Sequence, residues 1–196
     1  MQKAIKKEQR QIEICLSLKR CDYLSRSQLQ AIHNLGSPRN TSRVLKDMSR
    51  YVTYFRDGEA IYYLTKEGRE LVNAKKVRKK TLQARHFIMR NSLYIAYGCP
   101  ETWKNEVKLE LPNRVKAICD ALFSHDGRYY IIEVDHTQTM LANKTKMSKY
   151  RKLIDLGVFD RKPAFIWITT TEYRSRKLEE LCEGLDVKVF TISDFI

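Results

Sequence analysis

The sequence lacks the features that mark a membrane or secreted protein. No apolar run approaches the length needed to cross a bilayer, and the charged start MQKAIKKEQRQIEI is not followed by an apolar run of signal-peptide length. The five cysteines are odd in number and form no CxxC spacing, which argues against a disulfide framework and against zinc. We therefore expect a cytoplasmic protein with reduced cysteines and no membrane partner.

Acidic residues are scarce in the first part of the chain. Residues 1–80 contain 19 Lys and Arg against 8 Asp and Glu, a net charge of +11, whereas residues 81–196 contain 18 against 15, a net charge of +3. A surplus concentrated in one half indicates a partner that is an extended polyanion, with nucleic acid as the first candidate. The length of 196 residues suits one large domain or two small ones.

Hydrophobic periodicity predicts three helices in the first fifty residues, over about 5–18, over the segment that follows Ser25, and over about 39–51. Ser25 is a suitable N-cap for the second of them. The dipeptide Asp57-Gly58 predicts a two-residue type I′ turn that pairs Arg56 with Glu59. Thr65 then caps a closing helix, KEGRELVNA.

This order of elements is that of a winged helix-turn-helix, in which the third helix enters the major groove of double-stranded DNA. The expected contacts lie on the polar face of the third helix, at the start of the second helix and at the tip of the wing. They are Arg39, Asn40, Ser42, Arg43 and Lys46 toward the groove, and Ser25, Arg26, Ser27, Gln28 and Arg56 toward phosphates. The alternative is a helical interaction module whose basic face is only solvated.

The run KKVRKK at residues 75–80 separates the two halves of the chain. It is either a solvated linker or a set of non-specific phosphate contacts. We expect three segments: a winged helix-turn-helix over 1–74, a basic linker over 75–80 and an α/β domain over 81–196.

The second half predicts a helix over about 81–97, a strand over 107–111 and a hairpin at Asp126-Gly127. Residues directly opposed in that hairpin have numbers that sum to 253, which places Asp120, Glu133 and Asp135 on one face. Opposed like charges destabilise a hairpin, so a divalent metal or a Lys or Arg must compensate them.

A helix over about 139–157, a strand over 164–169, a helix over 175–182 and a strand over 187–192 complete the pattern. The lysines Lys144, Lys146 and Lys149 flank the first of these helices. The whole order predicts an α/β (α+β) domain with a mixed sheet.

Asp before a hairpin and Glu-x-Asp on its second strand resemble the core of restriction-endonuclease-like nucleases. The segments YYLTKEGRELV, ARHFIMRNSLYIA, ICDALF, IIEVDHT and KMSKY resemble the replication-relaxation family of plasmids and mobile elements. The resemblance implies a winged helix joined to a nuclease-like core, with a part in plasmid replication and DNA relaxation.

One departure from the nuclease pattern concerns Asp135, which stands where such cores usually carry Lys. Activity would require Lys146 or Lys149 to supply that charge, with Asp120 and Glu133 holding Mg²⁺. The alternative, which we favour, is a core that has lost activity and whose carboxylates are held by lysines.

The sequence therefore predicts a sequence-specific DNA-binding protein of a plasmid, phage or other mobile element. It would act in replication, origin processing or transcriptional control, without a required cofactor. A homodimer and a replication or relaxase protein are further possible partners. The competing hypothesis is a Mg²⁺-dependent endonuclease or nickase that the winged helix targets to DNA.

Overall fold

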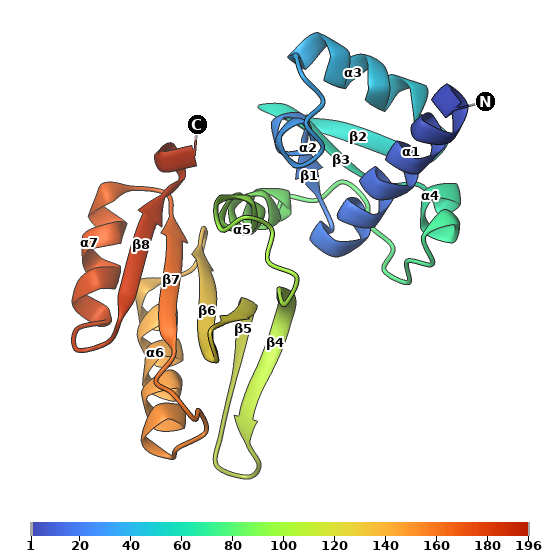
Figure 1. Cartoon of the computed structure of the whole chain (residues 1–196). Coiled ribbons are helices and arrows are strands. Elements are labelled where there is room, and N and C mark those ends of the chain that lie inside the picture. Colours follow the sequence, from blue (N-terminus) through green and yellow to red (C-terminus); the bar gives the residue numbers. More distant parts are fainter. Residues whose placement is uncertain (1, 196) are drawn as a thin grey trace. The chain divides into compact units, whose positions relative to one another are not determined.

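The computed structural model describes residues 2–195, which divide into two compact units, residues 2–91 and residues 92–195 (Figure 1). We call them unit 1 and unit 2 and describe each by itself. Among the described residues, no helix combines the length and apolarity that a membrane crossing requires.

Unit 1 consists of the 20-residue helix α1, several shorter helices and a small antiparallel sheet with strand order β1-β3-β2. Its elements are α1 (Gln2–Cys21), β1 (Leu24–Ser25), α2 (Arg26–Ile32), α3 (Pro38–Asp47), β2 (Val52–Asp57), β3 (Glu59–Leu64), α4 (Lys66–Leu71) and the first part of α5 (Ala84–Ala96). Ser25 and Thr65 are N-caps, as the sequence predicts, and Ser37 caps α3 with Pro38 in its first turn. Helix α3 ends earlier than predicted because residues 48–51 form turns that lead into β2.

The predicted register of the β2–β3 hairpin is wrong by one residue. Asp57 lies opposite Glu59, and Arg56 lies opposite Ala60 rather than Glu59. A type I′ turn needs positive φ at both central residues, but in this turn only Gly58, with φ of 72°, has it. The hairpin therefore turns around the single residue Gly58.

The core of unit 1 includes an aromatic cluster against which the start of α5 packs. Tyr23 packs against Phe55, Tyr63 and Phe87, with ring centroids 5.2–6.3 Å apart. The side chain of Asn91 donates to the carbonyl oxygens of residues 21 and 23 at 3.0 and 2.7 Å. The first half of α5 therefore belongs to unit 1, and the division between the units falls after Asn91, beyond the basic run at which the sequence suggests the join.

The basic run over residues 75–80 is attached to unit 1. Arg78 donates two hydrogen bonds, of 2.9 and 2.6 Å, to the carboxylate of Asp22, which is 4% exposed. The hydroxyl of Tyr23 donates to the carbonyl oxygen of Lys79 at 2.7 Å. Arg78 therefore has an internal carboxylate partner, which a freely solvated linker would not provide.

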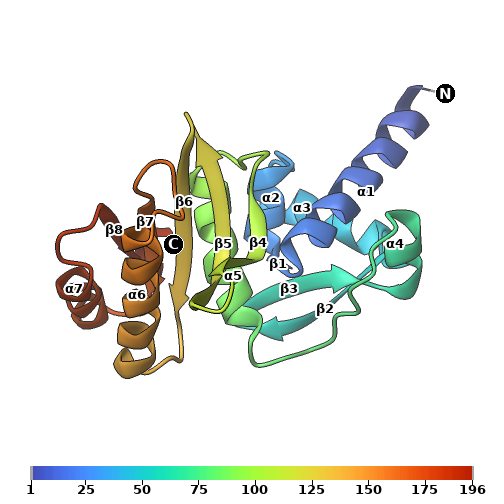
Figure 2. The ribbon, with the colours of Figure 1, turned by 90° about the horizontal axis from the view of Figure 1, so that it is seen from below.

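Unit 2 is a mixed five-stranded sheet with the order β4-β5-β6-β7-β8, which confirms the predicted fold class. Strands β4, β5 and β6 pair antiparallel, whereas β6, β7 and β8 run parallel. The elements are β4 (Lys104–Leu111), β5 (Val115–His125), β6 (Arg128–Asp135), α6 (Met140–Asp155), β7 (Ala164–Thr169), α7 (Glu172–Leu181), β8 (Val187–Thr191) and the 3₁₀ helix η1 (Ile192–Phe195). Helices α6 and α7 lie on the same face of the sheet (Figure 2).

The second hairpin has the predicted type I′ turn, with positive φ at both Asp126 (48°) and Gly127 (72°). Its pairing follows the predicted sum from His125–Arg128 to Ala121–Ile132. Beyond that point the ladder stops, because the carboxylate of Asp120 accepts the amide hydrogen of residue 134 at 2.8 Å.

Strict alternation from the hairpin turn predicts Cys119 on the same face as Phe123, and this prediction is wrong. Both Cys119 and Leu122 belong to the buried cluster beneath α6 and α7, although strict alternation would place them on opposite faces. On the paired strand, Glu106 opposes this break and has φ of 54°. The backbone of both strands is therefore irregular where Asp120 turns toward β6.

Gly68 gives a test of the packing of unit 1. A Cβ added at Gly68 would lie 2.0 Å from the carbonyl oxygen of Tyr51. We expect Gly68→Ala to lower the free energy of unfolding by about 1–3 kcal/mol, because the backbone at Tyr51 must move. Urea denaturation measures the change. Lys66→Ala, an exposed position on the same helix, should change it by less than about 0.5 kcal/mol; equal effects would contradict the packing.

Candidate functional site

Glu133 is a fully buried carboxylate of the predicted nuclease-like site. It lies on β6 and is 0% exposed. Its Oε1 accepts a hydrogen bond from the hydroxyl of Tyr150, and its Oε2 pairs with the ammonium of Lys146. Both partners come from α6, where they are separated by one helical turn and face the sheet.

Burial raises the pKa of Glu133 well above its ordinary value, and the nearby charge of Asp120 raises it further. Lys146 and Tyr150 oppose this rise without cancelling it. Burial alone would lower the pKa of Lys146, but the charges of Glu133 and Asp120 outweigh it, so the pKa of Lys146 is raised. Lys146 therefore stays charged and compensates the acidic pair.

Asp135 has a separate set of partners. Arg174, from the first turn of α7, donates to both of its carboxylate oxygens at 2.6 Å. Asn143 and Thr169 donate further hydrogen bonds of 2.8 and 2.7 Å. Burial would raise the pKa of Asp135, but the hydrogen bonds from Arg174, Asn143 and Thr169 outweigh it and lower the pKa.

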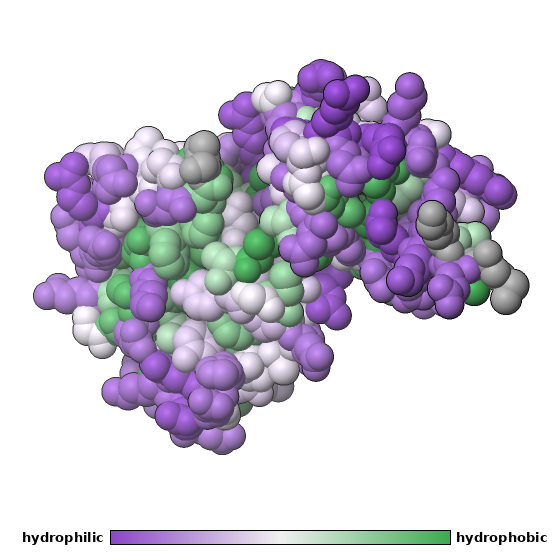
Figure 3. All heavy atoms as spheres, turned by 45° about the horizontal axis from the view of Figure 1, so that its top comes forward, coloured by the Kyte–Doolittle hydropathy of each residue, from purple (hydrophilic) through white to green (hydrophobic). Residues whose placement is uncertain are grey.

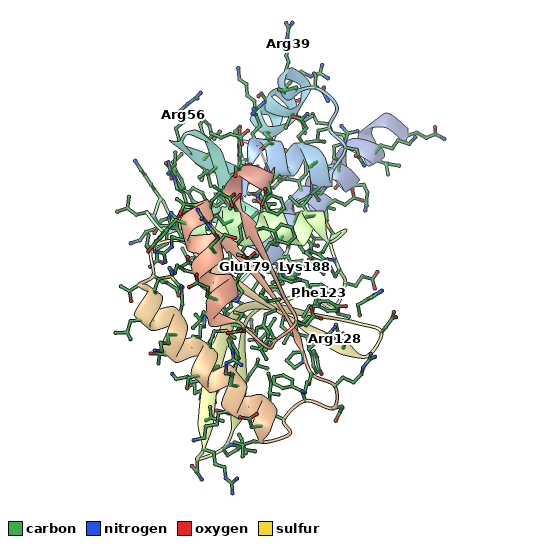
Figure 4. All side chains as sticks on the ribbon, turned by 90° about the vertical axis from the view of Figure 1, so that its left-hand side faces the viewer. Arg39, Arg56, Phe123, Arg128, Glu179 and Lys188 are labelled. Atoms are coloured by element: carbon green, nitrogen blue, oxygen red, sulfur yellow. The ribbon has the colours of Figure 1, made fainter. Side chains whose placement is uncertain are left out.

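In unit 1, a cleft of about 920 Å³ lies between α3 and the β2–β3 hairpin. Arg39, Ser42 and Lys46 line it from the exposed face of α3, and Arg56 lines it from β2. Figure 4 shows the labelled side chains of Arg39 and Arg56 projecting outward from unit 1. Hydrophilic side chains cover most of the face of unit 1 that Figure 3 shows.

Two other residues of α3, Asn40 and Arg43, do not line this cleft. The side-chain oxygen of Asn40 accepts a hydrogen bond of 2.8 Å from Arg43, and its nitrogen donates to the carbonyl oxygen of Leu35 at 2.7 Å. The amide of Asn40 is thus already used within the protein. We infer that it positions Arg43.

The start of α2 is arranged differently from the expected phosphate site. Ser25 and Gln28 are buried and form a capping box, and Gln28 also donates to the carbonyl oxygen of Ile88. Glu59 accepts hydrogen bonds from both the amide and the hydroxyl of Ser27, at 3.0 and 2.7 Å, and pairs with Arg26 at 2.9 Å. A carboxylate therefore lies where a phosphate was expected.

Residues 16–167 match the family described as replication-relaxation. The chain belongs to the replication-relaxation family. Membership indicates a role in the replication of mobile elements. Comparison with curated proteins gives no match.

Among solved structures, the crystal structure of protein VC1899 from Vibrio cholerae is similar to this replication-relaxation protein. The two chains share 14% sequence identity with a TM-score of 0.38, over 91% of this chain and 46% of that one. The replication-relaxation chain therefore spans less than half the length of that protein.

The carboxylates of this replication-relaxation protein do not fit a Mg²⁺ site. Both oxygens of Glu133 already accept hydrogen bonds, one of them from a cation, and Asp120 accepts a backbone amide. Within residues 2–195, no group of three or more His, Cys, Asp or Glu could hold a metal ion. A divalent cation would compete directly with the ammonium of Lys146.

The sequence indicated that either a metal or a basic side chain compensates the carboxylates, and it named Lys146 and Lys149 but not Arg174. Lys149 remains exposed. A signal for Arg174 lies in the order of the elements. Parallel pairing of β6 with β7 brings Asp135 opposite Thr169, and α7 begins only three residues after Thr169, so the first turn of α7 lies near Asp135. Tyr150 was expected to face inward, but not to bind a carboxylate.

Removing Arg174 tests the compensation of Asp135. We expect Arg174→Ala to destabilise the protein at pH 7 by about 3 kcal/mol, because a buried carboxylate loses its cation. Arg174 lowers the pKa of Asp135, so its contribution is present above the ordinary value of 3.8 and is lost as pH falls through the lowered pKa. The difference from the wild type should therefore shrink in acid.

Chemical denaturation at neutral and acid pH measures this difference. Arg176→Ala, an exposed residue two positions along α7, is the matched control and should be nearly neutral at both values. A cost for Arg174→Ala that is independent of pH would contradict the pairing.

Proposed function

We propose that this chain is a sequence-specific double-stranded DNA-binding protein of a plasmid, phage or other mobile element. In this proposal, unit 1 is a winged helix-turn-helix with α3 in the major groove and the β2–β3 hairpin as the wing. The single observation that carries the proposal is the cationic cleft between α3 and the hairpin. Family membership supports a role in replication, and we extend it to origin processing or transcriptional control.

The charge of the cleft favours a phosphate backbone as its occupant. Four cations, Arg26, Arg39, Lys46 and Arg56, line it with one acid, Glu59, which Arg26 neutralises. Three positive charges therefore remain for an incoming polyanion. Such contacts set affinity and orientation rather than sequence preference.

Sequence preference must come from side chains that reach base edges. We assign this role first to Arg43, whose planar guanidinium can pair with the two acceptors of guanine in the major groove. Asn40 holds it from the side. Ser42 is a second candidate, because it is exposed on the same helix. We leave Ser25 and Gln28 out of the proposed contacts, since both are buried and bonded internally.

Two substitutions on α3 should separate these roles. Arg43→Ala should weaken binding to the preferred duplex by about 1–3 kcal/mol and relax its specificity, because a base contact is lost. Lys46→Ala should weaken all duplexes alike and reduce the slope of log affinity against log salt by about 0.9, because one phosphate contact is lost. Fluorescence anisotropy with duplexes obtained from a selection of bound sequences measures both.

Lys66→Ala on α4 serves as the matched control, since Lys66 is exposed but outside the cleft. It should bind both preferred and random duplexes as the wild type does. A wild-type chain that binds no duplex at low salt would refute the proposed function.

We further propose that the carboxylates of unit 2 are structural and that the chain does not cleave DNA. The argument is that Lys146 supplies the positive charge that a metal would otherwise provide to Glu133 and Asp120. Tyr150 uses the other oxygen of Glu133. Both oxygens of Glu133 thus have protein partners in the absence of a metal.

Supercoiled plasmid gives a direct test. We expect no nicking or linearisation by the purified protein with Mg²⁺ or Mn²⁺, under conditions where it binds the plasmid. Asp120→Ala and Glu133→Ala variants are the controls for contaminating nucleases. Cleavage by the wild type that both variants abolish would establish the competing endonuclease hypothesis.

A further inference from the structure

A row of stacked aromatic rings crosses the face of the unit 2 sheet opposite α6 and α7. Trp103 stacks on Phe123 with a centroid distance of 5.8 Å and an interplanar angle of 13°. Phe123 stacks on Tyr130 at 4.7 Å and 6°. The row thus runs from the start of β4 through β5 to β6. In Figure 4, Phe123 lies on the opposite side of the sheet from α6 and α7.

The row of rings ends abruptly at β7. In the parallel register, Tyr130 lies opposite Ala164, whose side chain is a single methyl group. Tyr130 and Ala164 both line a cavity of about 550 Å³. A small residue in line with three stacked rings leaves room for a further planar group against them.

Cationic side chains border this cavity. Lys188, on β8, is exposed and lines it. Arg128 is fixed there by a pair with Asp186 at 2.7 Å and by a hydrogen bond to the carbonyl oxygen of Lys162 at 2.9 Å. Its guanidinium carbon lies 5.9 Å from the ring centroid of Tyr130. Figure 4 shows Phe123, Arg128 and Lys188 in the same region of the sheet.

We propose that this cavity binds one unpaired base of single-stranded DNA, with the base against the aromatic row and its phosphate near Lys188. Aromatic rings beside a positively charged border are the general means by which proteins bind single strands without sequence preference. The proposal rests on the proposed function only in taking nucleic acid as the ligand class. It uses no residue of unit 1 and none of the carboxylates beneath α6.

A paired duplex does not satisfy this site, because its bases are stacked on one another and their faces are covered. A free phosphate does not satisfy it either, because it leaves the aromatic surface unused. The cavity instead suits a ligand that presents a flat ring and an anion together. An unpaired nucleotide has both groups one sugar apart.

Two substitutions test the proposal in the full chain, with a labelled short oligothymidylate as the probe. Ala164→Leu fills the space beside Tyr130, and Lys188→Glu reverses the charge at the border. Each should weaken binding of the single strand by about fivefold or more, Ala164→Leu because one stacked base is lost and Lys188→Glu because a phosphate contact is replaced by a like charge. Duplex affinity should stay unchanged because unit 1 is not altered, and an unchanged urea denaturation transition shows that unit 2 of each variant is folded.

Lys144→Glu is the matched charge reversal, because Lys144 is exposed on α6, across the sheet from the cavity. It should leave single-strand binding closer to the wild type than Lys188→Glu does. An oligonucleotide of the same length with abasic sugars separates base stacking from phosphate contact. Its affinity should be lower than that of oligothymidylate, and Ala164→Leu should leave it unchanged.

Equal affinity for the abasic and thymidine strands, or undiminished thymidine binding by both cavity variants, would overturn the proposal. A wild-type chain that binds the single strand but no duplex would instead refute the proposed function of unit 1 and leave this inference standing. The two failures are therefore distinguishable.

Discussion

A carboxylate that leaves water must gain a cation or hydrogen bonds, and this requirement organises both units of the protein. Within residues 2–195, the buried acidic residues are Asp22, Glu133 and Asp135. Asp22 pairs with Arg78, Glu133 with Lys146 and Asp135 with Arg174. The partners lie 13 to 56 residues apart in the sequence and on different segments, so each pair joins two parts of the chain. The stability that each pair contributes depends on both members being present, because removing one of them leaves a buried charge without compensation.

Local chemistry allowed much of the fold to be predicted. Asp126-Gly127 specifies a turn through its own backbone preferences, and Ser25 and Thr65 specify helix starts in the same way. The Asp57-Gly58 turn failed as a prediction because only Gly58 has positive φ, and Asp57 and Glu59 instead pair with Arg85 and Arg26 outside the hairpin. A pattern confined to the strands carries no information about such partners.

The site was predictable to the extent that it follows from alternation along one strand. Glu133 and Asp135 are two residues apart, yet they have different partners, because Lys146 and Arg174 come from different helices. Asp120 was harder to place, since its carboxylate accepts a backbone amide in place of a ladder hydrogen bond. Alternation assumes an unbroken ladder, and it fails at the residue that breaks it.

The position of Glu59 has a consequence for how a duplex could lie on unit 1. Its carboxylate accepts the Ser27 amide at the start of α2 and pairs with Arg26, so neither donor is available to a phosphate that approaches the hairpin from that side. The exposed cations of α3 that line the same cleft, Arg39 and Lys46, would attract phosphates. In the proposed complex, the free cations of α3 and the occupied start of α2 would together set a border for the sugar-phosphate chain, and this border would fix which base pairs come within reach of α3.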